Sequence, residues 1–190
     1  MVTRIFDIPF HYHNKFPKDN ALAAKVNGKW ELYSTADFIK TGNSLSCGLM
    51  KLGLKKDDKV AIISNNRPEW NFADLAMQQL GIVNVPIYTT LSESEIAFIL
   101  NDCGATLMFV SDAALLKKIT RVKPSVPSLK EVFTFDLVEG ASNWKELLVD
   151  PSQDELDRLD SIRNSIHPND LATLLYTSGT TGNPKGVMLT

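Results

Sequence analysis

Short apolar segments alternate with amphipathic segments between residues 60 and 110, and this alternation constrains the fold more than any other feature of the sequence. Val60–Ser64, Ile82–Tyr88 and Ala105–Val110 are almost entirely apolar, which is typical of strands buried on both faces. The segments between them carry apolar residues at helical spacing. Strands that alternate with helices favour a parallel sheet. We therefore predict an α/β fold, a mostly parallel sheet with helices on both faces.

Helix boundaries in this region can be read from capping residues. Ser34 with Asp37, and Ser92 with Glu95, have the spacing of a capping box, in which each side chain bonds the other residue's backbone N–H. Gly104 stands where a helix favours glycine at its C-terminal end. These signals predict helices that begin after Ser34 and after Ser92.

The N-terminal segment predicts a small hairpin. Ala21–Val26 and Trp30–Tyr33 are joined through Asn27-Gly28, a pair that suits a two-residue turn because both central positions take positive φ. Further upstream, His11 and His13 have the spacing of one strand face. A metal site needs more ligands than this pair, and none is near in the sequence, so we predict no metal site.

The alternation of apolar and amphipathic segments is less regular after Ser111. Val132–Phe135 is a candidate strand, and the acidic run Asp150–Asp160 is interpreted as a solvated linker or helix face. We expect residues 1–190 to form one incomplete N-terminal domain. It would consist of a βαβ core over 1–120, a looser connecting segment over 121–170, and a strand, loop and further strand start over 171–190.

Charge and cysteine content narrow the function class. The 190 residues include 20 Lys and Arg against 22 Asp and Glu, so there is no basic excess to bind a nucleic acid. Cys47 and Cys103 are too few for a disulfide framework and are expected to be reduced, buried thiols. No run is long enough to span a membrane, and no secretory signal is evident. These features favour a cytoplasmic protein and leave peripheral membrane contact open.

Residues 171–190 carry the chemistry. Leu171–Tyr176 predicts a strand, and the next ten residues combine glycines, hydroxyls and one lysine. Glycine lets the backbone approach an anion, successive N–H groups form a concavity for it, and lysine adds a positive charge. The spacing differs from the strand-to-helix phosphate loop and from the nucleophile elbow, so Ser178 is not expected to be a nucleophile. A surface hairpin without ligand is the alternative interpretation.

Tyr176–Gly186 resembles the signature phosphate loop of the adenylate-forming superfamily, which includes acyl-CoA synthetases, luciferases and peptide-synthetase adenylation domains. Residues 60–76 and 81–100 also resemble the N-terminal part of long-chain fatty acid–CoA ligases. The resemblance implies a reaction in two steps. A carboxylic acid reacts with ATP to give an acyl-adenylate and pyrophosphate, and the thiol of coenzyme A then displaces AMP. Mg²⁺ would bridge phosphate oxygens.

The resemblance also implies which residues hold the β- and γ-phosphates of ATP: Thr177, Ser178, Gly179, Thr180, Thr181, Gly182 and Lys185. Family members are several hundred residues long, so catalytic residues are expected beyond residue 190. We therefore expect this chain to be inactive alone, and to associate with itself through an exposed edge strand near Thr190.

Several alternatives stay open. The enzyme could adenylate an aryl or amino acid, or the chain could be a non-catalytic nucleotide-binding module. Asn65–Arg67 follow a strand and could bind an anion, although capping of the next helix by Asn66 explains them more simply. Tyr88–Leu91 occupy the corresponding place after the next strand, where a ligand path and ordinary loop packing are both compatible with the sequence.

Overall fold

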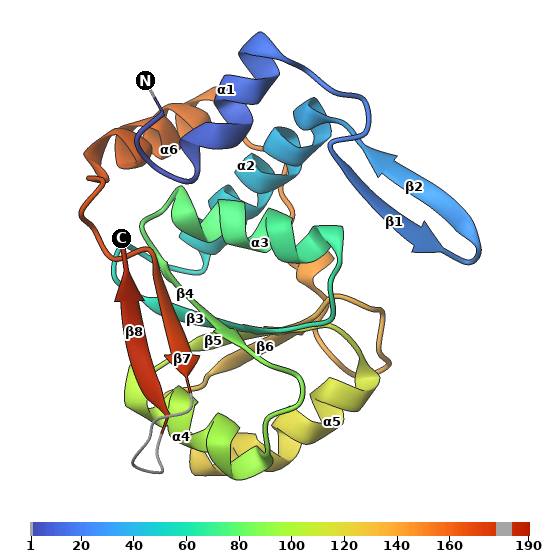
Figure 1. The fold of residues 1–190 in the computed structure, drawn as a ribbon, viewed down its shortest axis with the longest axis vertical. Helices are drawn as coiled ribbons and strands as arrows, with labels where there is room; N and C mark the ends of the chain where they lie inside the picture. The colour runs from blue at the N-terminus through green and yellow to red at the C-terminus, as the bar shows by residue number, and fades with distance from the viewer. Residues whose placement is uncertain (1, 178–183) are drawn as a thin grey trace. The chain divides into compact units, whose positions relative to one another are not determined.

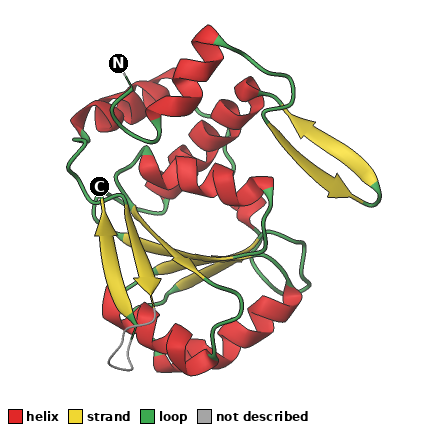
Figure 2. Ribbon diagram, in the orientation of Figure 1, coloured by secondary structure: helices red, strands yellow, loops and turns green. Residues whose placement is uncertain are grey.

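The computed structural model describes residues 2–177 and 184–190 and divides into two compact units, which we describe separately (Figures 1 and 2). The first unit comprises residues 1–54, 66–80 and 147–170, and the second comprises residues 55–65, 81–146 and 171–190. Among the described residues, no helix combines the length and apolarity needed to cross a membrane.

A six-stranded sheet of order β6-β5-β3-β4-β7-β8 forms the second unit. The strands are β3 (Lys59–Ile63), β4 (Val83–Ile87), β5 (Leu107–Val110), β6 (Glu131–Thr134), β7 (Thr173–Thr177) and β8 (Lys185–Leu189). Neighbouring strands pair in parallel, except that β8 runs antiparallel to β7 at the edge. The predicted α/β class with a mostly parallel sheet is confirmed.

Two helices, α4 (Glu93–Cys103) and α5 (Ala113–Val122), lie on one face of this sheet (Figure 1). Ile99 of α4 and Ile119 of α5 are buried against strand residues such as Val85 and Met108, because apolar side chains on the helices and strands meet in one core. Short 3-10 turns follow at η1 (Lys123–Ser125) and η2 (Trp144–Leu147).

The predicted boundaries of α4 are confirmed. The Ser92 side chain accepts a hydrogen bond from the Glu95 backbone N–H, and the Glu95 carboxylate accepts one from the Ser92 backbone N–H, which completes the capping box. Gly104 ends the helix with φ of 67°, in the left-handed region that favours glycine.

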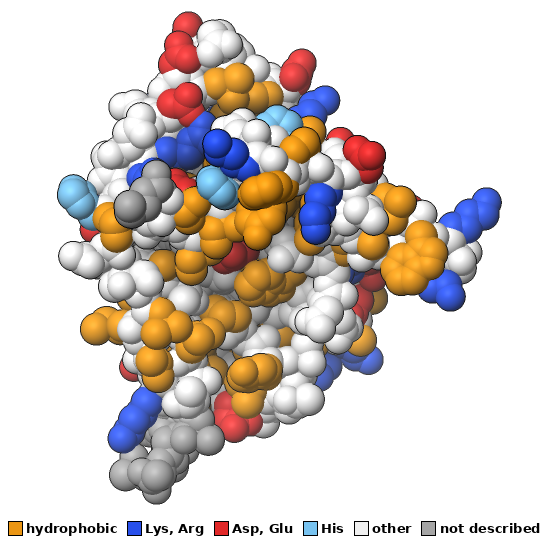
Figure 3. All heavy atoms as spheres, turned by 45° about the horizontal axis from the view of Figure 1, so that its top comes forward, with side chains coloured by type: hydrophobic (Ala, Val, Ile, Leu, Met, Phe, Trp, Pro, Cys, Tyr) orange, Lys and Arg blue, Asp and Glu red, His pale blue; other side chains and the backbone are white. Residues whose placement is uncertain are grey.

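The first unit is mainly helical and carries the predicted hairpin. Its elements are α1 (Asp7–Lys15), β1 (Leu22–Val26), β2 (Lys29–Tyr33), α2 (Thr35–Lys51), α3 (Pro68–Gln78) and α6 (Gln153–Ser165). Asn27 and Gly28 take φ of 50° and 79°, as a two-residue turn between β1 and β2 requires. Figure 3 shows apolar and lysine side chains exposed together on this hairpin.

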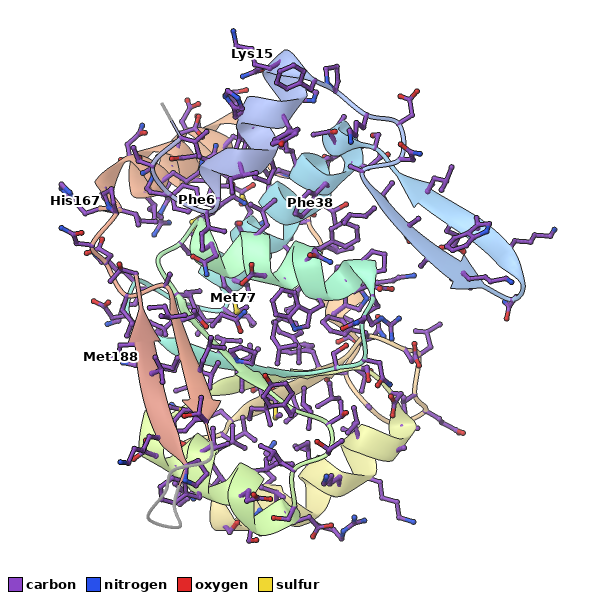
Figure 4. The ribbon with its side chains drawn as sticks, in the orientation of Figure 1. Phe6, Lys15, Phe38, Met77, His167 and Met188 are labelled. Carbon is purple, nitrogen blue, oxygen red and sulfur yellow. The ribbon has the colours of Figure 1, made fainter. Side chains whose placement is uncertain are left out.

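One N-terminal expectation is wrong. His11 and His13 lie in helix α1, not on a strand. That helix has no polar N-cap in the sequence. Instead, Asp7 accepts hydrogen bonds from the backbone and guanidinium of Arg4, and burial of Phe6 beside Leu75 anchors its beginning. Figure 4 labels Phe6 at the start of this helix.

The start of α3 also differs from the expectation. Its N-cap residue is Arg67, which makes no capping bond with its side chain, so Asn66 does not cap the helix. Pro68 at the first turn needs no partner for a backbone N–H that it lacks, and its φ is already helical.

Helices α5 and α6 lie after Ser111, where the alternation of apolar and amphipathic segments is less regular. Asp112 accepts a hydrogen bond from the Leu115 N–H and begins α5, and a capping box of Ser152 and Glu155 begins α6. The acidic run before residue 160 therefore lies largely on a helix. Cys47 is buried, Cys103 is half-buried, and both thiols are free.

Candidate functional site

Strands β7 and β8 form a hairpin whose ends frame the candidate phosphate loop. Their register pairs Tyr176 with Gly186 and Thr177 with Lys185, so Thr177 and Lys185 form the last pair before the connection. The structure thus brings together two predicted site residues that are eight positions apart in the sequence. Ser178, Gly179, Thr180, Thr181 and Gly182 lie outside the described residues.

Burial alternates along β7 and leaves polar groups exposed at its end. Leu174 and Tyr176 face the core, whereas Thr177 is exposed, as is Lys185 on β8. Within residues 2–177 and 184–190, no carboxylate forms an ion pair with the Lys185 ammonium. A hydroxyl and a positive charge are therefore available side by side for an anion.

The place of Thr177 in the sheet is one that favours ligands. It ends a strand parallel to β4, and open α/β sheets bind ligands beyond the carboxyl ends of their parallel strands. The hairpin therefore lies where such sheets bind ligands, a placement that the composition of the segment did not indicate.

Asn65 and Arg67, the other candidate anion binders, are engaged with carboxylates. The Asn65 side-chain amide lies 3.4 Å from Asp112 Oδ2. The Arg67 guanidinium donates to both carboxylate oxygens of Glu69, at 2.8 and 3.0 Å. These partners reduce the positive potential that an anion would meet, so this segment is a weaker candidate than the hairpin.

The loop after β4 is held in place by α5. Lys118 Nζ donates to the backbone carbonyl of Thr89 at 3.2 Å and to that of Leu91. Tyr88 keeps 71% of its surface exposed. The loop is thus anchored at its backbone while one large aromatic side chain stays available for contact.

A side-chain hydrogen bond between β7 and α4 was not predicted from the sequence. The Tyr176 hydroxyl donates to Asp102 Oδ2 at 2.5 Å. Burial, followed by this hydrogen bond, raises the pKa of Tyr176 well above its usual range. The phenol therefore stays protonated and able to donate at neutral pH. No local pattern could reveal a partner this far away in the sequence.

A cavity of about 960 Å³ opens in the first unit, lined in part by α2 and residues 148–151. Its wall is mainly apolar. Its charged lining side chains, Lys40, Asp37 and Asp150, are of both signs, so they select no ligand class. Among the described residues, no group of three or more His, Cys, Asp or Glu side chains could hold a metal ion.

Comparison with known families agrees with this geometry. The AMP-binding enzyme family matches residues 10–190, which is most of the chain. The chain therefore belongs to the AMP-binding enzyme family, and the predicted resemblance to adenylate-forming enzymes is confirmed.

Curated relatives match the chain over most of its length. The chain is 34% identical over 181 residues to the long-chain-fatty-acid–CoA ligase ACSBG1 of Rattus norvegicus, a match that covers 93% of this chain and 25% of the relative. It is 33% identical over 171 residues to the long-chain-fatty-acid–CoA ligase FadD15 of Mycobacterium tuberculosis, covering 87% of this chain and 27% of the relative. The chain thus spans about a quarter of the length of the curated relatives it matches.

Solved structures share the fold. A Rhodopseudomonas palustris protein designated a long-chain-fatty-acid CoA ligase superposes with a TM-score of 0.79 at 22% identity, over 98% of this chain and 44% of that one. A red-emitting luciferase of Phrixothrix hirtus superposes with a TM-score of 0.76 at 25% identity, over 97% of this chain and 34% of that one.

Proposed function

We propose that this chain is the ATP phosphate-binding part of an acid–thiol ligase. In this proposal Thr177–Gly182 and Lys185 hold the β- and γ-phosphates. One observation carries the proposal: the register places the exposed Thr177 hydroxyl and the exposed Lys185 ammonium opposite each other, at the two ends of the glycine- and hydroxyl-rich segment. Membership of the AMP-binding enzyme family supports it.

The described groups suit a leaving pyrophosphate. When a carboxylate attacks the α-phosphorus, negative charge grows on the departing phosphates. Lys185 would neutralise part of this charge, and Thr177 would donate a hydrogen bond to a phosphate oxygen. Holding the departing group at both ends of the loop would also align the α-phosphorus for attack, which lowers the entropic cost of reaction.

The described residues contain no group of three or more His, Cys, Asp or Glu side chains that could bind Mg²⁺. We propose that the ion enters on the phosphate oxygens of ATP, as Mg²⁺ commonly does, and we assign no step to it.

Long-chain fatty acid is the proposed acid, and coenzyme A the proposed thiol, because the relatives at 33–34% identity are named long-chain-fatty-acid–CoA ligases. The catalytic residues would lie in sequence that the relatives have and this chain does not contain. We therefore propose that the 190-residue chain binds ATP without forming the acyl-adenylate.

Carboxylate-dependent exchange of labelled pyrophosphate into ATP tests the proposal. The assay compares this chain with a protein extended to the length of the relatives, across long-chain, short-chain, aromatic and amino acids. We expect exchange by the extended protein only, strongest with long-chain acids. Strongest exchange with aromatic or amino acids would refute the substrate proposal, and exchange by neither protein would refute the ligase proposal.

A further inference from the structure

The base of the β7–β8 hairpin is closely packed one residue before the candidate loop. The Tyr176 ring lies over the backbone of Gly186 on the neighbouring strand. A Cβ atom at Gly186 would come within 3.1 Å of Tyr176 Cζ and 3.3 Å of its hydroxyl oxygen, so glycine leaves room for the ring to cross the strand. This contact fixes where the Tyr176 side chain can lie.

Beyond Gly186, the phenol reaches helix α4. Its hydroxyl donates to Asp102 Oδ2 at 2.5 Å, the short distance expected for an O–H donor and a carboxylate acceptor. Tyr176 is 8% exposed, whereas Asp102, near the end of α4, is exposed. The bond therefore links the last buried residue of β7 to a helix that packs on the sheet.

The link acts immediately beside the proposed phosphate ligands. Thr177 follows Tyr176 and pairs with Lys185, which precedes Gly186. Any rotation or slip of the hairpin at Tyr176 would move both ligands together. Strand β8 is an edge strand with β7 as its single pairing partner, and the register that joins β7 to β4 lies at Thr173, three residues before Tyr176. A side-chain bond to α4 therefore adds a constraint from outside the ladder at the end of β7.

We propose that Tyr176, through its bond to Asp102 and its contact with Gly186, is a positioning residue that holds Thr177 and Lys185 in the geometry that binds ATP phosphates. The inference rests on the proposed function and adds to it a mechanical support from α4. Tyr176 itself touches no phosphate in this account, because its hydroxyl is directed to Asp102.

Tyr176→Phe is the variant that isolates the bond. It keeps the ring over Gly186 and removes only the hydroxyl. Because Asp102 is exposed, water can hydrate the carboxylate that loses its partner, so the variant is expected to fold. Asp102→Ala removes the acceptor at the other end. Tyr33→Phe is the matched control, since it removes a hydroxyl that also donates to a carboxylate, that of Glu31, at 3.2 Å in the first unit.

Two readouts test the proposal on the 190-residue chain. The first is amide hydrogen exchange at Thr177 and Lys185 by NMR, and the second is the Kd for Mg·ATP by isothermal titration. We expect Tyr176→Phe and Asp102→Ala each to speed exchange and to raise the Kd by about tenfold, the change that corresponds to loss of one charge-assisted hydrogen bond. The double variant is expected to match either single one, and Tyr33→Phe to match the wild type.

The outcomes separate this inference from the proposed function. If wild-type chain binds ATP and Tyr176→Phe leaves both exchange and Kd within about twofold, the positioning role is refuted. Faster exchange with an unchanged Kd also refutes it, because Tyr176 then only stabilises the hairpin. A wild-type chain that does not bind ATP refutes the proposed function, and the phosphate role of Tyr176 with it.

Discussion

Gly48, inside helix α2, is a position where the structure predicts a large effect of adding one methyl group. A Cβ atom there would lie 1.8 Å from the carbonyl oxygen of Leu147 and 2.8 Å from its carbonyl carbon. Ordinary contact begins near 3.4 Å, so the backbone at Leu147 would have to move by about 1.6 Å along that line (3.4 minus 1.8). Glycine permits this close approach of the two backbones.

The magnitude for Gly48→Ala follows from two opposing effects. Overpacking against backbone costs about 3 kcal/mol or more, at the upper end of its usual range. Alanine recovers about 1 kcal/mol because it favours the helix interior more than glycine does. We expect a net loss of about 2 kcal/mol or more in the free energy of unfolding.

Gly42→Ala is the matched control in the same helix. Its Cβ would meet Leu75 Cδ2 at 2.6 Å and Leu75 Cγ at 3.0 Å, which are atoms of a side chain and not of the backbone. A side chain can shift more readily than a backbone carbonyl, so the net loss of stability is expected to be smaller than in Gly48→Ala. Urea denaturation followed by far-UV circular dichroism measures both variants. A Gly48→Ala protein as stable as the Gly42→Ala protein would show that the Leu147 backbone does not exclude a side chain at position 48.

Three further predictions concern α4 and the sheet edge. Ser92→Ala removes the acceptor for the Glu95 N–H and should lower the free energy of unfolding by about 1 kcal/mol in urea denaturation; no change would show that water replaces the cap. Hydrogen bonds from Ser92 lower the pKa of Glu95 in the folded state below its ordinary value of 4.5. The ionised carboxylate therefore stabilises the fold above pH 4.5, and this stabilisation is lost as the pH falls through the lowered pKa of the folded state. Stability measured from pH 5 to pH 3 should therefore fall less steeply in Ser92→Ala than in wild type, and equal slopes would contradict this. Met188, labelled on β8 in Figure 4, is 71% exposed on the edge strand, and Met188→Lys should reduce self-association in sedimentation velocity; a wild-type chain that is monomeric throughout would contradict the expected edge contact.

Elements governed by local interactions were predictable from the sequence. Asn27-Gly28 determined the hairpin turn, and Ser92 with Glu95 determined the start of α4, because each signal acts within a few residues. The apolar segments of β3, β4 and β5 were predictable for the same reason. The capping signals at Asp112 and Ser152 were also present in the sequence and would have located α5 and α6.

Features that depend on tertiary contacts were not predictable. Helix α1 has Phe6 as its N-cap residue, without a side-chain capping bond, and Phe6 is buried against Leu75, a residue from a distant segment. The bond from Tyr176 to Asp102 crosses 74 positions, and no periodicity or motif encodes it. The motif at Tyr176–Gly186 indicated which residues could bind phosphate, whereas the pairing of Thr177 with Lys185 required the sheet.

The role of Lys185 in binding phosphate is measured by the affinity of wild-type chain and of Lys185→Ala for Mg·ATP and for pyrophosphate, with isothermal titration. Lys29→Ala, an exposed lysine at the start of β2, is the control for a general loss of positive charge. We expect wild-type chain to bind both ligands, Lys185→Ala to bind each of them about tenfold or more weakly, and Lys29→Ala to bind both as wild type does. Equal affinities in wild type and Lys185→Ala would contradict the assignment of the β7–β8 hairpin as the phosphate site.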